Sequence, residues 1–583
     1  MRCALGQQVG YAIRFEEVTS AQTQIKFLTD GMLLREALSD PLLSKYSVVM
    51  VDEAHERSLN SDVLLCLLKT IREKRSDLRI IVSSATIEAE SVADFFRTDD
   101  GQDSISIISL DGRAHPVDIE FSQTPVDDYI AATTKTVIQI HKEEAAGDVL
   151  VFLTGRDDID RCLQLLSDYS RTILPTAHAL QPLPLFAGLS QAEQMYVFSP
   201  AAENTRKVIL STNIAEASVT IDGILYVVDC GYAKIRTYNA STNIEMLSRE
   251  PISQASAIQR AGRAGRTRAG KCYRLYTQQV YQRLRQTTPP EIQRTNLAPL
   301  VLQLKALGIG NIVKFPFLSP PPAKLLSRSL ETLFTLGALD DNAQLTSPDG
   351  VRMAELALSP MMAKALLSAA SATFDCLPEM LTIAAMTSLQ STGNMNIWFG
   401  DSASDKTVNL ARRKFAVEEG DHLTFLNVYQ AFVTTGRRDQ RWCQQHHLSY
   451  KALTKAVSIR SQLQRHMTRF GIVVDDRVSN SEAALAQQKS TRIVKCLTAG
   501  FFMQAARMNP LDGTYQPITS LGRNQLTMYA HPTSLMFNRK ADYIVFNELL
   551  ETSDKIYIKD ISKIEKSWLT ELGNGYYRIG QSA

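Results

Sequence analysis

Several features are missing from this 583-residue sequence, and each absence narrows the kinds of protein it can encode. No run approaches about eighteen uninterrupted apolar residues, and the first residues lack the apolar core of a signal peptide, so we expect a soluble intracellular protein with no membrane segment. The eight cysteines have no paired spacing, which is typical of reduced thiols and not of a disulfide framework. The net charge is only +2, so no overall positive field marks a nucleic-acid-binding protein.

A phosphate-binding loop is also missing. The pattern Gly-x-x-x-x-Gly-Lys-Ser/Thr, which holds nucleotide phosphates with backbone N–H groups and a lysine, does not occur in these residues. The sequence Gly270-Lys271-Cys272 does not replace it, because no glycine loop precedes the lysine. A nucleotide site formed by this sequence would therefore lack one of the usual phosphate-holding elements.

The length predicts roughly three to five domains, since one hydrophobic core does not grow without limit. Residues 1–117 and 118–289 alternate short β-branched runs with helical patterns, which is typical of α/β domains with a parallel sheet. In the first domain, residues 47–51 and 79–82 are expected to be strands buried on both faces. In the second, strands are expected at residues 149–153, 208–210, 224–228 and 272–276.

The C-terminal half has a different pattern. Residues 290–357 resemble a small helical domain, and residues 358–496 are strongly helical with long amphipathic stretches. Residues 497–583 are rich in short strands, which predicts a small β-barrel. The polar stretch 475–488 is expected to be an exposed loop.

The sharpest candidate site is the pair Asp52 and Glu53, which follows the apolar run 47–51. At a strand's carboxyl end, one carboxylate can hold Mg²⁺ through its water shell while the next polarises an attacking water. His55 could relay between these carboxylates and a facing domain. The alternative is that the two acids only end the strand or cap the following helix.

A row of basic residues forms a second candidate site. On a helix, Arg263 and Arg266 project toward the same side, where two guanidinium groups can stabilise charge on a γ-phosphate. Gln259 precedes them on that side and could orient a water. The surrounding block 251–285 has eight Lys or Arg and no Asp or Glu, so it either faces phosphates or is a solvated surface.

Small polar residues follow other predicted strands. Because parallel strands end at one edge of a sheet, Ser84 and Thr86 would lie beside Asp52 and could couple domain movement to hydrolysis. Hydroxyl, amide and backbone N–H groups at strand-to-helix turns suit phosphate oxygens, although each turn could also be simple helix capping. Such turns contain Thr154, Gly155, Thr212, Asn213, Ser218, Thr220 and Asp222.

Together these motifs resemble the DEAH-box RNA helicases of superfamily 2. Asp-Glu-Ala-His, Ser-Ala-Thr, Ser-Thr-Asn-Ile-Ala-Glu and Gln-Arg-Ala-Gly-Arg-Ala-Gly-Arg occur in the order of that family. Further matching segments extend the resemblance over essentially the whole chain and separate it from DEAD-box and viral helicases. They are residues 29–36, 290–294, 418–424, 442–446 and 501–506. The spliceosome-associated members are most similar.

The resemblance implies two RecA-like domains, the first of them incomplete, then a winged helix, a helical ratchet domain and an OB-fold. The implied boundaries are 1–117, 118–289, 290–357, 358–496 and 497–583. A single RNA strand would thread between the RecA-like pair and the C-terminal domains, moved 3′ to 5′ by NTP-driven closure. The resemblance also implies a nuclear protein of pre-mRNA splicing, with spliceosomal partners and a glycine-rich-motif activator protein near the winged helix.

The resemblance assigns roles to individual residues. Mg²⁺ binding falls to Asp52 and Glu53, and catalysis to these two with His55, Gln259, Arg263 and Arg266. ATP or another NTP would contact Ser218, Thr220, Asp222 and Phe198. The ring of Phe198 would stack on adenine, although an aromatic residue in an apolar helix more often belongs to the hydrophobic core. RNA would contact Thr29, Asp30, Gly31, Thr154, Gly155, Thr212 and Asn213. The family usually has Thr where this chain has Ala217.

The missing phosphate loop leaves two main hypotheses open. In the first, the protein is an ATP-dependent RNA helicase whose written chain lacks its N-terminus, through a mispredicted start or an alternative transcript. In the second, it is a truncated, non-catalytic isoform that binds RNA or helicase partners. We favour the first for its ancestry and expect the chain as written to have little or no ATPase activity. A DNA track is a third hypothesis, since backbone contacts carry no base code.

Overall fold

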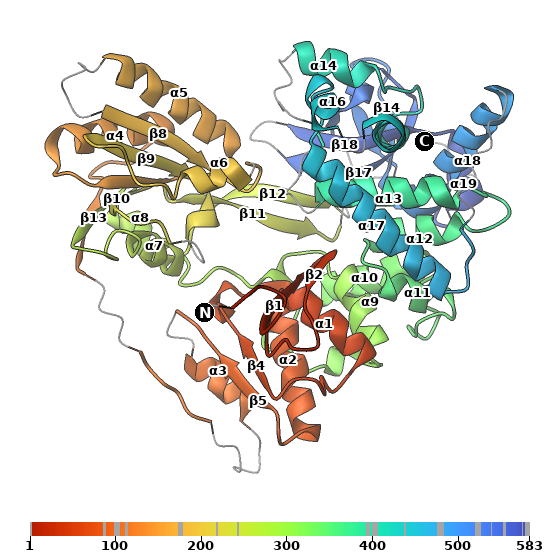
Figure 1. Cartoon of the computed structure of the whole chain (residues 1–583), viewed down its shortest axis with the longest axis horizontal. Coiled ribbons are helices and arrows are strands. Elements are labelled where there is room, and N and C mark those ends of the chain that lie inside the picture. Colours follow the sequence, from red (N-terminus) through yellow and green to blue (C-terminus); the bar gives the residue numbers. More distant parts are fainter. Residues whose placement is uncertain are drawn as a thin grey trace.

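The structure is a computed structural model whose elements are arranged as Figure 1 shows. The residues that it describes are 3–85, 89–97, 105–110, 115–172, 179–189, 191–216, 220–241, 244–391, 397–398, 406–436, 439–474, 483–518, 526–537, 539–551, 555–573 and 575–577. Across these ranges, every helix is too short or too polar to traverse a lipid bilayer.

The first domain contains two small sheets that share one set of helices. Its elements are β1 (Val9–Ile13), β2 (Glu16–Val18), β3 (Ile25–Leu28), α1 (Asp30–Ser39), β4 (Val48–Val51), α2 (Leu59–Lys74), β5 (Arg79–Val82) and α3 (Ala89–Phe96). One sheet has the order β2-β1-β3, and β4 pairs with β5 in parallel.

The expectation that β4 and β5 are buried on both faces is wrong. Val49 and Val51 pack in the core with residues of α2, whereas Val48, Met50 and Ile81 are 49%, 59% and 49% exposed. Among the described residues, helices therefore cover only one face of this strand pair. The apolar run predicted the strands but not how many layers pack on them.

The second domain is a parallel α/β sheet with the strand order β6-β13-β10-β7-β9-β8. Its strands are β6 (Val117–Phe121), β7 (Asp148–Phe152), β8 (Ala179–Leu185), β9 (Thr205–Ser211), β10 (Ile224–Asp229) and β13 (Gly270–Arg274). Its helices are α4 (Tyr129–Glu143), α5 (Arg156–Thr172), α6 (Gln191–Tyr196), α7 (Gln254–Ala261) and α8 (Gln278–Arg283). All four expected strands are present with bounds shifted by a few residues, and β7 and β10 are buried throughout, as central parallel strands should be.

A long antiparallel hairpin leaves this domain and was not expected from the sequence. It consists of β11 (Tyr232–Asn239) and β12 (Ile244–Pro251), and Figure 1 shows it reaching toward the C-terminal domains. Its Tyr238 N–H donates to the carbonyl of Arg294 at 2.7 Å. The hairpin thereby ties the second domain to the C-terminal half of the chain.

The remaining chain forms a helical region and a closed barrel. Its helices are η3 (Glu291–Gln293), α9 (Ala298–Ala306), η4 (Ile312–Lys314), α10 (Ala323–Thr335), α11 (Asp349–Glu355), α12 (Pro360–Ser368), α13 (Leu377–Ser391), α14 (Lys406–Arg413), α15 (Asp421–Ala431), α16 (Gln440–Gln445), α17 (Tyr450–Arg469), α18 (Ala483–Phe501) and α19 (Lys566–Leu572). The barrel runs β14-β15-β16-β18-β17, as the strand-rich tail predicts. Its strands are β14 (Ala505–Met508), β15 (Tyr515–Pro517), β16 (Met528–Ala530), β17 (Tyr543–Glu551) and β18 (Ile556–Lys563).

The expected loop 475–488 is only partly tested. Residues 475–482 lie outside the described residues, and from Ala483 onward the chain is already in α18, so a loop extending to residue 488 is wrong. Helical hydrogen bonding over those polar residues continues into the apolar part of the same helix.

The hydrophobic cores show which parts of the chain pack together. One continuous core joins α1 and α2 of the first domain to α9 and α12 of the helical region. The parallel sheet of the second domain has separate cores on its two faces. The first domain therefore shares a core with the C-terminal half, while the sheet of the second domain has cores of its own and joins the C-terminal half through the β11–β12 hairpin, whose Tyr238 belongs to the continuous core.

Candidate nucleotide and RNA site

The two acidic residues form a tight turn at the carboxyl end of β4. Glu53 has φ of 51° and precedes the short helix η1 (Ala54–Glu56), and its N–H donates to Oδ1 of Asp52 at 2.9 Å. A non-glycine residue adopts this left-handed conformation rarely, so the turn is maintained by surrounding contacts. We call residues 52–57 the acidic turn.

His55 fixes the carboxylate of Glu53. Its Nδ1 accepts a hydrogen bond from the N–H of Ala85 at 3.1 Å, so the ring proton is on Nε2, which faces Oε2 of Glu53 at 3.3 Å. The bond joins the ends of β4 and β5, and Ser84 lies exposed beside it. Thr86, which the sequence places in the same role, lies outside the described residues.

The expectation that Arg263 and Arg266 share a helix is wrong. Helix α7 ends at Ala261, and residues 262–266 form a turn closed by bonds such as Arg263 N to the carbonyl of Arg260 at 3.1 Å. The turn packs closely on the chain before β6, since a Cβ at Gly265 would lie 2.5 Å from the carbonyl oxygen of His115. We call residues 260–266 the arginine turn.

Both predicted arginines are held by polar groups of the β9–β10 connection. Arg263 donates to the carbonyl of Glu216, and Arg266 donates to Oγ1 of Thr220. Ser218, in the same connection, lies outside the described residues, and Asp222 is exposed. Gln259 is half-buried in the last turn of α7.

Arg260 anchors this turn, and the sequence motif, which groups it with Arg263 and Arg266, does not show that it is buried. It is fully buried and pairs with Asp229 at 2.7 Å and with Glu216 at 2.5 Å, and Tyr276 donates to the other oxygen of Asp229 at 2.8 Å. Such a buried pair needs its hydrogen bonds to offset the loss of hydration. The only signal in the sequence was a lone aspartate ending a buried strand.

The acidic and arginine turns interact across the domain boundary. Burial and the neighbouring Arg266 lower the pKa of Arg263 to about 10, while Glu53 and Glu216 act in the opposite direction. Glu53 belongs to the first domain and Arg263 to the second. The structure therefore brings together the two sets of residues that the sequence separates.

The residues present also fit a Mg²⁺ ion held through water. The Asp52 side chain is exposed and, within the described part of the chain, accepts a neighbouring backbone N–H, so carboxylate oxygens remain for a hydrated cation. Within the described residues no group of three or more His, Cys, Asp or Glu side chains could hold a metal directly.

Four predicted RNA contacts lie at neighbouring strand ends of the second domain. Thr154 follows β7 and Thr212 follows β9, and these strands pair in parallel with Phe152 opposite Ser211. Thr154 donates to Asp158. Gly155 packs against Lys234, whose Nζ would lie 2.9 Å from an added Cβ, and Asn213 is exposed.

Phe198 is placed differently from the other nucleotide candidates. It follows α6 and is 40% exposed, and it belongs to none of the core clusters of the described residues. Its ring is therefore accessible, and stacking on a base stays a prediction.

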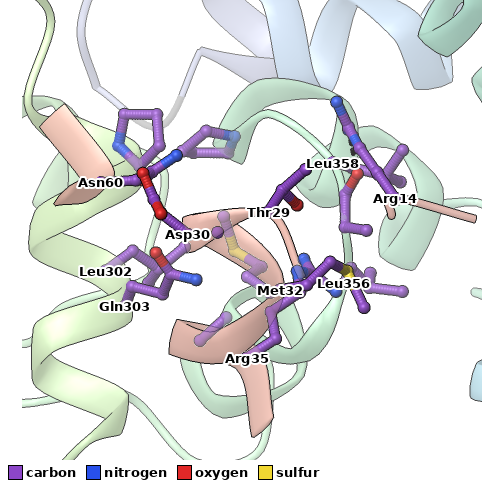
Figure 2. A pocket seen from close by; sticks show the side chains of 16 residues that line it. Arg14, Thr29, Asp30, Met32, Arg35, Asn60, Leu302, Gln303, Leu356 and Leu358 are labelled. Atoms are coloured by element: carbon purple, nitrogen blue, oxygen red, sulfur yellow. Dashed lines mark hydrogen bonds between the residues drawn. The ribbon is translucent and has the colours of Figure 1, made fainter. Parts of the chain in front are cut away.

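The other predicted RNA contacts line a cavity of about 380 Å³, shown in Figure 2. Thr29, Asp30 and Gly31 reach it from the start of α1, and Leu302 and Leu356 come from the helical region. The hydroxyl of Thr29 makes no capping bond to α1, and burial raises the pKa of Asp30. The N-terminus of α1 thus opens into a cavity between two domains.

Two arginines in this cavity were missed by the sequence reasoning. Arg14 enters from the β1–β2 turn and Arg35 from α1, as Figure 2 shows. Arg14 donates to the carbonyl of Ala357, and among the described residues neither arginine has a carboxylate partner. Burial, and after it the positive charge of Arg14, lowers the pKa of Arg35 to about 10. The signal was available, since Arg35 lies in the RNA-contacting segment 29–36.

Comparisons with known proteins agree with this architecture. Descriptions that match are the helicase conserved C-terminal domain at residues 132–268, the helicase-associated winged-helix domain at 329–358, the ratchet-like helicase-associated domain at 359–425 and the oligonucleotide/oligosaccharide-binding fold at 493–576. The chain is 46% identical over 584 residues to "Probable ATP-dependent RNA helicase DHX35" of Homo sapiens, covering 99% of this chain and 80% of that protein. It is also 46% identical to the Caenorhabditis elegans homolog, covering 99% of this chain and 76% of the relative.

The chain belongs to the DEAH-box RNA helicase family. This family consists of enzymes, and the matched domains follow the order expected from the sequence. The closed barrel is the family's OB-fold, and the long helices α13 and α17 lie in its helical region. The acidic turn contains the sequence Asp-Glu-Ala-His, and the arginine turn contains the sequence Arg-Ala-Gly-Arg-Ala-Gly-Arg.

Proposed function

We propose that this protein is an ATP-dependent RNA helicase that couples hydrolysis between its first two domains to 3′–5′ movement of one RNA strand. The relatives are named as probable ATP-dependent RNA helicases. The electrostatic effect of Glu53 on Arg263 is the observation that carries the proposal, because it relates the two motifs across the boundary between the first two domains.

The chain's own residues divide the chemistry among them. Asp52 holds the water shell of Mg²⁺, which when bound would neutralise phosphate charge. Glu53, oriented by His55, accepts a proton from the attacking water. Arg263 and Arg266 stabilise charge on the γ-phosphate, for which Arg266 must exchange the Thr220 hydroxyl for phosphate oxygens. Gln259 orients the water.

Nucleotide recognition and coupling fall to residues around these two turns. Thr220 and Asp222 contact the nucleotide, and Phe198 stacks on its base. Ser84 couples domain closure to hydrolysis through the end of β5, where the N–H of Ala85 donates to His55. The same roles are proposed for Ser218 and Thr86 from the sequence alone.

RNA contacts both the first domain with its helical region and the second domain. The cavity with Thr29, Gly31, Arg14 and Arg35 belongs to the first domain and helical region, and Asp30 shapes it. The second set of contacts is at the strand ends of the other body: Thr154, Gly155, Thr212 and Asn213. Closing and opening the boundary between the bodies changes the spacing between the two sets, which moves the strand.

The wider assignments rest on the family resemblance. We propose the domain limits 1–117, 118–289, 290–357, 358–496 and 497–583. We also propose a nuclear role in pre-mRNA splicing, with spliceosomal proteins and a glycine-rich-motif activator protein as partners.

Unwinding of RNA duplexes with one single-stranded overhang tests the proposal. With Mg²⁺ and ATP, a 3′ overhang should support strand separation and a 5′ overhang should not, with Glu53→Gln as the background. Equal unwinding of both substrates would overturn the direction, and equal activity on matched DNA would overturn the choice of RNA.

A second candidate function is a non-catalytic module that binds RNA or helicase partners. It is favoured by the absence of a Gly-x-x-x-x-Gly-Lys-Ser/Thr loop from residues 1–583. This candidate predicts RNA binding together with phosphate release no faster than that of Glu53→Gln. RNA-stimulated release above that background would exclude it.

A further inference from the structure

Arg57 connects the acidic turn to the C-terminal half of the protein. Its Nε and Nη2 donate to the two carboxylate oxygens of Asp62 at 2.8 and 3.1 Å, and Nη2 also donates to Oγ of Ser319 at 2.6 Å. Ser319 lies between η4 and α10, far along the chain. A planar guanidinium held at both ends of its fork has little freedom to turn.

The backbone of Arg57 and of Leu59 just after it reinforces this connection. The carbonyl of Arg57 accepts the N–H of Glu291 at 3.1 Å, and the Glu291 carboxylate accepts the N–H of Leu59 at 2.9 Å. Glu291 begins η3, where the chain enters the helical region. The segment after the acidic turn is thus bound to two separate places in the C-terminal half, one near residue 291 and one at Ser319.

The strength of the connection comes from burial. Asp62 is buried in α2, where burial raises the pKa of its carboxyl and the Arg57 guanidinium opposes that shift. Removing either partner would leave the other without its matching charge in a poorly hydrated place. Opening the pair would therefore cost free energy.

Contacts fix the conformation of the acidic turn at both of its ends, near Glu53 and at Arg57. Glu53 and Arg57 both have φ of 51°, and they flank η1 on its two sides. Left-handed non-glycine residues persist only where neighbouring contacts fix them. At one end the contact is His55 with Ala85, and at the other it is Arg57 with Asp62 and Ser319.

We propose that Arg57 is a positioning residue that links the docking of the 291–319 segment to the orientation of the Glu53 carboxylate. RNA engaged by the helical region then acts on hydrolysis through this segment, without contact between RNA and the reacting groups. The inference rests on the proposed hydrolytic role of Glu53.

The test uses a change far from the acidic turn. Ser319→Ala removes one bond to Arg57 and leaves the Arg57–Asp62 pair. Ser241→Ala is the matched control, because the Ser241 hydroxyl accepts a similar long-range bond from Lys324 at 2.7 Å. Hydrogen–deuterium exchange of residues 50–58 should become severalfold faster in Ser319→Ala and stay unchanged in Ser241→Ala. Unchanged exchange in Ser319→Ala overturns the inference, whether or not the protein hydrolyses ATP.

Turnover gives the second measurement and separates this inference from the proposed function. Arg57→Gln should lower RNA-stimulated kcat by about tenfold to a hundredfold with KM for ATP unchanged, since a misplaced base affects the chemical step. Arg57→Lys, which keeps the charge but not the fork, should lie between. A rise in KM alone would contradict a positioning role. Absence of turnover in the unmodified protein would favour the non-catalytic candidate function, while the exchange result would still decide the link.

Discussion

Glu53 and Arg263 interact electrostatically although one belongs to the first domain and the other to the second. The first domain shares a core with the helical region, whereas the sheet of the second domain has cores of its own and its β11–β12 hairpin reaches the shared core. The electrostatic interaction therefore crosses the boundary between the first and second domains. The surroundings of a nucleotide bound there would change with the relative position of the two domains. A motor needs such a link between nucleotide and domain position.

The arginine turn should account for most of the rate above background. Arg263→Ala is expected to reduce whatever RNA-stimulated phosphate release the chain shows to the background, an effect of up to about 10³-fold, because such guanidinium groups stabilise charge on the transferred phosphate. Arg268→Ala is the control, since Arg268 lies in the same basic block but donates to the carbonyl of Ala146. Release is measured against Glu53→Gln. Equal losses in both arginine variants would contradict a specific role for Arg263.

Arg35 should contribute to RNA affinity and not to folding. Arg35→Gln should weaken binding of single-stranded RNA and reduce the slope of log affinity against log salt by about 0.7, the value for one phosphate contact. The Tm should not fall, because Arg35 faces Arg14 without a carboxylate partner in the described structure. Exposed Arg79 on β5 provides the control variant Arg79→Gln. A lower Tm with an unchanged slope would show a structural role instead.

Arg260 should contribute to stability. Arg260→Ala removes one partner of a fully buried pair and leaves Asp229 uncompensated, which is expected to lower the unfolding free energy by about 3–5 kcal/mol. Urea denaturation of the second domain measures this. A loss below about 1 kcal/mol, as for an exposed ion pair, would contradict the anchoring role.

His422 should make the protein less stable in mild acid. Burial lowers its pKa to about 4, and its Nδ1 lies 2.9 Å from Oγ of Ser562. Between pH 6.5 and 4 the unfolded chain binds this proton and the folded one does not, so the unfolding free energy falls as pH falls, by at most about 3 kcal/mol. The difference between the wild-type protein and His422→Asn isolates this contribution, because Asp421 and Asp560 also titrate abnormally in the same interior. A pH-independent difference would refute it.

The sequence predicted most where local patterns decide the structure. The β-branched runs that became β7 and β10 are buried throughout, and the strand-rich tail is a closed barrel. It predicted least where distant residues meet. Nothing local pairs Arg260 with Asp229 or Arg57 with Ser319, and helical spacing misplaced Arg266 because helix α7 ends at Ala261.

The most direct test of the account is hydrogen–deuterium exchange of the two turns with a slowly hydrolysed ATP analogue, Mg²⁺ and single-stranded RNA. If residues 52–57 and 260–266 form one site, exchange should slow in both turns together, and Arg263→Ala should remove the protection from residues 52–57 as well. Protection of one turn alone, or protection at residues 52–57 that survives Arg263→Ala, would contradict a hydrolysis site shared between the two domains.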